Sequence, residues 1–190
     1  MVATYPNQKR VIVGHSMGGQ VIGLSDNINQ LDLLIPVAAS YGNWQNYTLP
    51  HKYKVGINWA FLFPIMTWWH GYFPASKYNM GEDCPKGVST DWWSWGWRRI
   101  PHSQILDNRK ISHSYKAATL PIKAYFTSDD MMATAKTIPH FKQDFVNADL
   151  TITTIKPEDY GIPKMAHMGM FSPKSIGFWE RILEDIKDIL

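Results

Sequence analysis

The chain has 190 residues, of which 45% are hydrophobic and 14% aromatic, so it is long enough for one globular domain with a sizeable core. Its net charge of +3 comes without any block of like charges, which argues against a nucleic-acid-binding protein. The most hydrophobic window, residues 55–69, is shorter than the roughly 20 residues of a membrane-spanning helix and contains Asn58 and Pro64. We therefore expect neither a nucleic-acid partner nor a transmembrane segment.

Cys84 is the single cysteine of the sequence, which excludes an internal disulfide bond. The N-terminus lacks the basic and then apolar order of a signal peptide, so we expect a cytoplasmic protein. Five histidines show no metal-ligand spacing with one another or with the cysteine: His51, His70, His102, His113 and His140. We expect no metal and no cofactor.

Strands and helices alternate in the first and last parts of the chain. The predicted strands are continuous apolar runs at residues 9–13, 31–38, 122–126 and 150–155. Apolar strands that alternate with helices are typical of a parallel sheet with both faces covered. The predicted fold class is therefore α/β, with a mainly parallel sheet and flanking helices.

Three helices are predicted around these strands. The first covers residues 17–24, and the second covers residues 133–145, where Pro139 disturbs it. The last helix follows Ser172 as N-cap and Pro173 at the first helical position. Its predicted apolar face consists of Ile176, Trp179, Leu183, Ile186 and Leu190.

Residues 41–115 interrupt the alternation of strands and helices. They hold eight of the nine Trp residues, with Gly and Pro scattered throughout, and no regular pattern of elements. We interpret this segment as an insertion and call it the cap. Residues 1–40 and 116–190 then form the core.

A serine lies between glycines in residues 14–19 (GHSMGG), directly after the first predicted strand. This Gly-x-Ser-x-Gly pattern fits a nucleophile elbow, a strained turn that lifts the Ser16 hydroxyl off the sheet. Side chains at Gly14 and Gly18 would collide with the neighbouring strand and helix, and His15 is expected to pack or bond locally. The alternative is a glycine-rich turn in which the serine only caps the helix.

A serine nucleophile needs a base, and the base needs a group that holds its tautomer. Asp129 and Asp130 come directly after the third predicted strand, at the edge where the sites of open α/β sheets form. His167 lies in the predicted loop before the last helix. The order Ser, Asp, His along the chain is the order that a nucleophile elbow predicts for its partners.

Residues 14–19 (GHSMGG), 128–130 (SDD) and 167–171 (HMGMF) together resemble the α/β-hydrolase superfamily. The last motif is similar to the His-Met-Gly-Phe-Phe type in a branch of predicted α/β hydrolases related to serine aminopeptidases and lysophospholipase-like enzymes. The resemblance covers the whole chain in order. It implies a triad of Ser16, His167 and Asp130, with Asp129 as the alternative acid.

The family places about four strands before the elbow, whereas only about eight residues precede the elbow strand here. The resemblance therefore implies an N-terminally truncated α/β-hydrolase fold. The backbone N–H of Met17 is the expected oxyanion donor, and the second donor is expected to be absent or to come from another chain. One edge of the elbow strand would be unpaired and apolar, so self-association through this edge is expected.

The cap occupies the position where α/β hydrolases carry a lid. We expect Trp68, Trp69, Trp92 and Trp93 to line an apolar pocket over the serine and to bind a small apolar ester or acyl substrate. The alternative is that these side chains form the cap's own core.

The resemblance implies a serine hydrolase that cleaves a carboxylic ester or similar acyl substrate through an acyl-enzyme. Two alternatives stay open. One is a non-catalytic binding or interaction domain on the truncated fold, and the other is an acyltransferase or thioesterase with the same triad.

Overall fold

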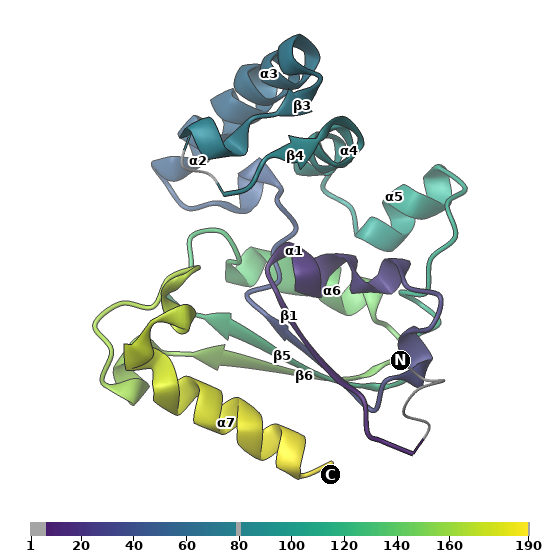
Figure 1. Ribbon diagram of the computed structural model, residues 1–190, viewed down its shortest axis with the longest axis vertical. Helices are drawn as coiled ribbons and strands as arrows, with labels where there is room; N and C mark the ends of the chain where they lie inside the picture. The colour runs from purple at the N-terminus through teal and green to yellow at the C-terminus, as the bar shows by residue number, and fades with distance from the viewer. Residues whose placement is uncertain (1–6, 79–80, 190) are drawn as a thin grey trace.

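The computed structural model describes residues 7–78 and 81–189, and its centre is a four-stranded sheet (Figure 1). The strand order is β1-β2-β5-β6, and all three pairings are parallel. The strands are β1 (Val11–His15), β2 (Leu33–Val37), β5 (Pro121–Thr127) and β6 (Asp149–Ile155). The predicted α/β class with a mainly parallel sheet is confirmed.

Strand β1 ends two residues later than predicted. Gly14 and His15 still pair with Pro36 and Val37 of β2, so the strand continues to the residue before the serine. All five residues of β2 are buried, as expected for a strand with helices on both faces of the sheet.

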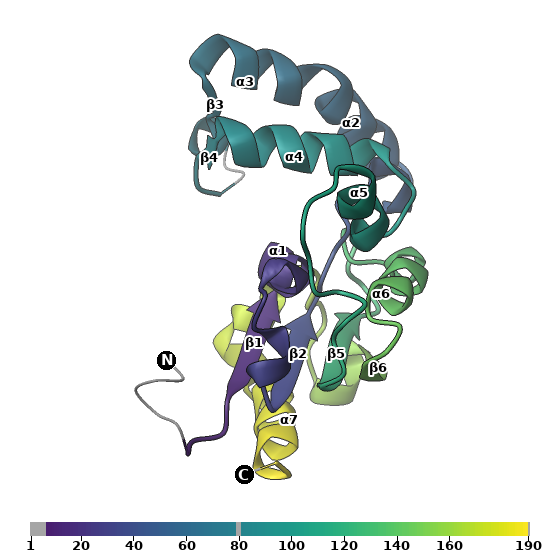
Figure 2. The ribbon, with the colours of Figure 1, turned by 90° about the vertical axis from the view of Figure 1, so that its right-hand side faces the viewer.

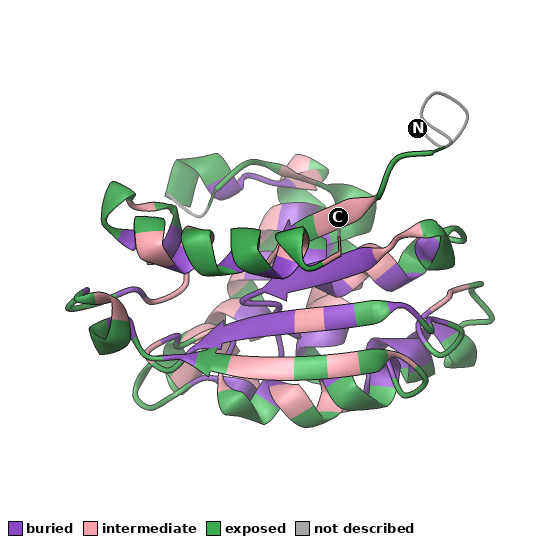
Figure 3. Cartoon of the chain, turned by 90° about the horizontal axis from the view of Figure 1, so that it is seen from below, coloured by how far each residue is buried: buried purple, intermediate pink, exposed green. Residues whose placement is uncertain are grey.

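Helices cover the two faces of the sheet unequally. Helices α1 (Met17–Gln20) and α6 (Ile138–Asp144) lie on one face, and α7 (Ile176–Lys187) lies on the other (Figures 1 and 2). Figure 3 views the sheet from the α7 side, with β2 almost entirely buried. Tyr125 and Phe126, successive residues of β5, point to opposite faces. Tyr125 contacts Phe178 of α7, and Phe126 contacts Phe141 of α6.

Two details of the predicted helices were wrong. Helix α6 begins only at Ile138, so Pro139 lies in its first turn, where a missing N–H is tolerated, and does not disturb its interior. In helix α7, Trp179 and Ile186 of the predicted face pack against the core, but Ile176 and Leu183 are 65% and 52% exposed, and Phe178 and Ile182 are the buried apolar residues. The predicted Leu190 lies outside the described residues.

Ser172 caps a short turn, residues 173–175, that precedes α7. Its hydroxyl accepts a hydrogen bond from Lys174 N, as the predicted N-cap does, but the α-helix starts three residues later than predicted.

The cap has its own small hydrophobic cluster, separate from the core. Its elements are α2 (His51–Ile57), α3 (Phe63–His70), β3 (Tyr72–Phe73), β4 (Cys84–Pro85), α4 (Lys86–Trp97) and α5 (His102–Asn108). A π-helical turn, Asn58–Leu62, joins α2 to α3. Trp59, Phe63, Phe73 and Ala75 are the buried members of the cluster. Among the described residues, no helix has the length and apolar character needed to cross a membrane.

Asp144 of α6 connects the first residue of the cap, Tyr41, and the start of α5 to the core. Its carboxylate accepts hydrogen bonds from Tyr41 Oη at 2.5 Å, His102 N at 3.1 Å and Ser103 N at 2.8 Å. The tyrosine precedes the cap helices, and the other two residues begin α5. Burial raises the pKa of Asp144, which is fully enclosed. Three donors therefore compensate for the removal of this carboxylate from water.

Strand β1 lies at an edge of the sheet. Within the described part of the chain it pairs only with β2, and Val13 at its middle is 41% exposed. An apolar strand with one unpaired row of N–H and C=O groups is a template for pairing with another chain.

The 190-residue chain should therefore self-associate, and Val13→Lys should reduce the association, because a charge on an edge strand opposes pairing. Multi-angle light scattering would measure the mass of both proteins. Ile176→Lys, which adds a charge at an exposed position of α7, is the matched control and should associate as the wild type does. A monodisperse wild-type monomer would contradict this prediction.

Candidate active site

Ser16 occupies a strained turn between β1 and α1. Its backbone angles are φ 51° and ψ −119°, in a region that residues with a side chain rarely adopt. Its N–H donates to Val37 O at 2.9 Å, and its carbonyl accepts from Gln20 N at 3.1 Å. The first bond ties the turn to β2 and the second begins the helix, so the chain passes from strand to helix without a loop.

The close approach of two glycines makes this turn sterically possible. A Cβ on Gly14 would lie 2.8 Å from Gly19 Cα, and a Cβ on Gly19 would lie 2.5 Å from Gly14 O. The steric role predicted for Gly18 is not found, since a Cβ built there has no described atom within 4 Å apart from its chain neighbours and the backbone of its own helix. The sequence analysis missed Gly19, although the pair of adjacent glycines in the motif was a signal for it.

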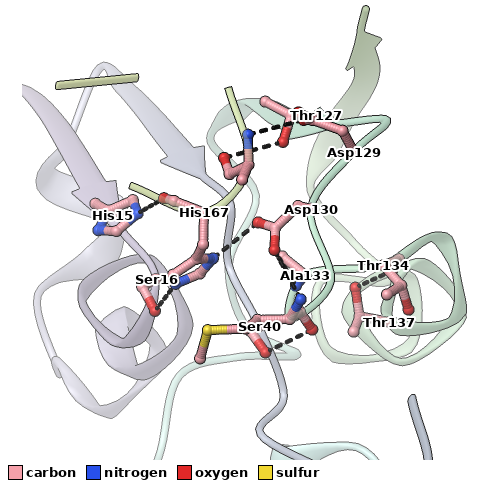
Figure 4. Close-up of polar contacts among 12 residues, drawn as sticks. His15, Ser16, Ser40, Thr127, Asp129, Asp130, Ala133, Thr134, Thr137 and His167 are labelled. Carbon is pink, nitrogen blue, oxygen red and sulfur yellow. Dashed lines mark hydrogen bonds and ion pairs between the residues drawn. The ribbon is translucent and has the colours of Figure 1, made fainter. Parts of the chain in front are cut away.

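His167 contacts both Ser16 and Asp130 (Figure 4). Its Nε2 lies 2.9 Å from Ser16 Oγ, and its Nδ1 lies 2.8 Å from Asp130 Oδ2. The His167 side chain is 13% exposed, and that of Asp130 is fully buried. The structure thus brings together the three residues that the sequence analysis selected from distant parts of the chain.

Asp130 is held in position by backbone groups after β5. Its Oδ1 accepts from Met132 N at 2.7 Å and from Ala133 N at 3.1 Å, which leaves Oδ2 for the histidine. Since backbone donors occupy the first oxygen, the carboxylate has a fixed orientation toward His167.

Asp129 has a different set of partners from Asp130. Its two carboxylate oxygens accept from Met165 N at 2.8 Å and Ala166 N at 2.9 Å. These residues directly precede His167, and Ala166 has a positive φ of 49°. Thr127 Oγ1 also donates to Ala166 O, at 3.3 Å. The Asp129 carboxylate therefore binds the backbone of the loop that carries His167, and it orients that loop.

His15 supports the same loop from the side of β1. Its Nε2 donates to His167 O at 2.9 Å, and its ring contacts Phe171 edge-on at 4.9 Å. Burial lowers the pKa of His15, so the ring is neutral near pH 7. These contacts are of the local kind expected from its position beside the serine.

Met17 is the first residue of α1, directly after the serine. A first-turn N–H has no acceptor within its own helix, so this group is available to an oxyanion formed at Ser16.

The four tryptophans predicted to bind substrate lie in two different environments. Trp68 and Trp69 are 76% and 73% exposed on α3. Trp92 packs edge-on against Trp59 at 5.3 Å, and Trp93 Nε1 donates to the carbonyl of the same residue at 2.8 Å. Within the described part of the chain, none of their ring contacts or hydrogen bonds involves the triad residues. Their role in substrate binding stays a prediction.

Metal-ligating residues are not clustered in the described ranges 7–78 and 81–189. No group of three or more His, Cys, Asp and Glu side chains is positioned there to hold a metal ion. Cys84 is a free cysteine in β4, and its pKa is raised by burial.

No protein-family profile and no curated protein matches the sequence. Among solved structures, the chain is similar to a monoacylglycerol lipase of Paleococcus ferrophilus, with a TM-score of 0.56 and 8% identity over 96% of this chain and 69% of that one. It is also similar to a metagenome-derived lipolytic enzyme, with a TM-score of 0.52, 12% identity, and coverage of 95% and 66%. The chain has the α/β-hydrolase fold. An esterase of Exiguobacterium antarcticum matches with a TM-score of 0.50, 14% identity, and coverage of 98% and 69%.

The chain spans about two thirds of the length of these α/β hydrolases, 66% to 69%. The α/β-hydrolase fold implied by the sequence resemblance is confirmed, with the Ser16 turn after β1 and Asp130 shortly after β5.

The glycine contact in the turn can be tested by comparing Gly19→Ala with Gly18→Ala. Gly19→Ala should lower the free energy of unfolding by about 1–3 kcal/mol, because the new methyl group meets the backbone of Gly14. Gly18→Ala is the matched control. It should leave the free energy of unfolding unchanged or raise it by up to about 1 kcal/mol, since alanine favours the helix. Urea denaturation would measure both, and equal losses in the two variants would contradict the predicted contact.

Proposed function

We propose that the protein is a serine hydrolase that cleaves a carboxylic ester or similar acyl substrate through an acyl-enzyme. The observation that carries this proposal is the continuous hydrogen-bonded chain from Ser16 Oγ through His167 to Asp130, with distances of 2.9 Å and 2.8 Å. Because the carboxylate only accepts, the ring carries its proton on Nδ1, and Nε2 is left to accept the serine proton.

In the proposed first step, Ser16 Oγ attacks the acyl carbon while its proton moves to His167 Nε2. The carbonyl oxygen becomes an oxyanion, and the N–H of Met17 donates to it. The intermediate collapses when the bond to the leaving alkoxide breaks and that oxygen takes the proton from Nε2. Water then attacks the acyl-enzyme with the histidine as base, which releases the acid and restores the serine.

Asp130 stabilises the imidazolium that forms in both steps and prevents rotation of the His167 ring. Asp129 does not contact the His167 ring, because its carboxylate binds the backbone of the two residues before the histidine. We propose that it is a positioning residue.

The ester class of the proposed substrate is supported by the proteins that share the fold. Three of them with a TM-score of 0.50 or more are described as a monoacylglycerol lipase, a lipolytic enzyme and an esterase. An acyltransferase or thioesterase would use the same acyl-enzyme and differ in the acceptor or in the leaving group.

Ser16→Ala should abolish labelling by a fluorophosphonate probe, since the probe reacts only with an activated serine oxygen. In-gel fluorescence would measure the labelling. Ser128→Ala removes an exposed hydroxyl two residues from Asp130 and should label as the wild type does. Unchanged labelling of Ser16→Ala would eliminate this serine as the nucleophile, whereas an unlabelled wild-type protein would favour the non-catalytic binding domain.

Asp130→Asn should lower the turnover of a p-nitrophenyl ester by about 10⁴-fold, because the amide stabilises the wrong tautomer of His167. Asp129→Asn should lower it by at most about 100-fold, as displacement of the histidine loop predicts. Steady-state kinetics at pH 7 would measure both variants. The opposite ranking would transfer the acid role to Asp129.

A further inference from the structure

A row of large apolar side chains on the cap is exposed to solvent. We call it the outer stripe, and each member is at least half exposed: Leu49, Tyr53, Ile57, Phe61, Ile65, Trp68 and Trp69. Single exposed apolar residues are normal on a protein surface, but seven neighbours along 21 residues form one patch. Patches of this kind mark sites of interaction.

The outer stripe lies on the opposite side of α2 and α3 from the cap's own cluster. Trp59, Phe63 and Thr67 are buried and lie two residues after Ile57, Phe61 and Ile65. Two residues on a helix correspond to a rotation of about 200°, so the two rows point in opposite directions. The buried row contacts α4: Trp59 and Phe63 contact Trp92, and Thr67 bonds to Ser89. The outer stripe therefore lies opposite the buried row, and Tyr53, Ile57 and Phe61 border a hollow with Trp97, the last residue of α4.

The π-helical turn keeps both rows straight. Residues four apart drift by about 40° per step around an α-helix, so a row with this spacing would wind away from the face. The wider turn at Asn58–Leu62 reduces that drift at the middle of the row. The exposed apolar side chains from Tyr53 to Ile65 thus remain on one face.

Figure 2 shows α3 at the end of the molecule farthest from the sheet, with α4 between α3 and the core. Trp68 and Trp69 of α3 therefore belong to the end of the cap that lies away from the sheet.

Two lysines flank the outer stripe. No acidic residue occurs from residue 33 to residue 81. Lys54 is exposed and precedes Ile57 by three positions, which puts it beside the stripe. At the other end, Lys86 and Trp68 line the same groove between α3 and α4. The apolar row thus has a cation at each end.

We propose that the outer stripe binds the surface of a lipid bilayer that contains anionic lipids. Aromatic residues at one face of a helix, with lysines at its margin, are the pattern of a helix that lies in the membrane interface. Trp and Tyr have an apolar body and a polar tip, so they suit the boundary between acyl chains and head groups. The stripe supplies Tyr53, Trp68 and Trp69 for that boundary.

A second copy of the chain fits this surface less well. A twofold contact would bring the same surface of each copy together, including Lys54 and Lys86, without an acidic residue in the stripe to pair with them. An anionic lipid surface satisfies both the apolar row and the two cations. The inference goes beyond the proposed hydrolase activity and does not depend on it.

Vesicle flotation tests this surface without any need for turnover. The protein carries Ser16→Ala, so that hydrolysis of lipid plays no part, and it is mixed with vesicles of phosphatidylcholine alone or with 30% phosphatidylserine, about a third of the lipid. In a density gradient, bound protein rises with the vesicles and self-associated protein does not. We expect flotation with the anionic vesicles and weaker flotation with phosphatidylcholine alone.

Replacement of the two exposed tryptophans should remove the binding. Trp68→Ala combined with Trp69→Ala should lower the floated fraction at limiting lipid by about tenfold or more. The matched control combines Val146→Ala with Leu183→Ala, two apolar side chains of the core that are 62% and 52% exposed. It should float as the parent protein does. Equal losses in the two double variants would overturn the proposal.

Replacement of the lysines tests the preference for anionic lipid. Lys54→Gln with Lys86→Gln should weaken binding to the anionic vesicles by about fivefold per lysine and leave binding to phosphatidylcholine unchanged. Lys142→Gln with Lys156→Gln removes two exposed charges of the core and should have no effect.

Two results would overturn the proposal outright. One is a parent protein that does not float with either type of vesicle. The other is a parent dimer in light scattering that becomes a monomer on Trp68→Ala with Trp69→Ala and never floats, which would assign the stripe to a second copy. Loss of fluorophosphonate labelling would refute the proposed activity and leave the flotation result intact.

Discussion

The contact between the backbones of Gly14 and Gly19 is the constraint on which the rest of the site depends. It lets β1 pass into α1 within one residue, and that residue, Ser16, takes up a positive φ that its side chain disfavours. The hydrogen bond from Ser16 N to Val37 O holds the turn against this strain, because β2 lies between two paired strands and is wholly buried. A rigid sheet thus supports a locally unfavourable conformation that directs one hydroxyl toward the histidine.

The parallel sheet also explains how the histidine is oriented. Parallel strands put their carboxyl ends at one edge, so the residues that follow β1, β5 and β6 meet there. His15 from β1 and Asp129 after β5 bind the backbone of the loop at His167, and Asp130 binds the ring. Backbone and ring are held by separate side chains, which accounts for the presence of two adjacent carboxylates.

Much of this arrangement was predictable from the sequence, because the apolar runs marked the strands and the order of Ser16, Asp130 and His167 matched a known pattern. The resemblance favoured Asp130 over Asp129 as the acid, and in the folded chain the backbone donors around the two carboxylates distinguish them. The cap was unpredictable for a different reason. The segment from α2 to α3 is apolar on both sides, so periodicity did not reveal which side was buried.

Asp144 has a consequence for how the cap and the core unfold. The cap begins at Tyr41, its helix α5 begins at His102 and Ser103, and all three residues donate to this single carboxylate. Separation of the cap from α6 would leave the buried carboxylate without these donors, and each lost hydrogen bond to a buried group destabilises the protein by about 1–3 kcal/mol. The cap and the core are therefore thermodynamically coupled, although their hydrophobic clusters are separate. Heat should melt them as one cooperative unit, in a single calorimetric transition.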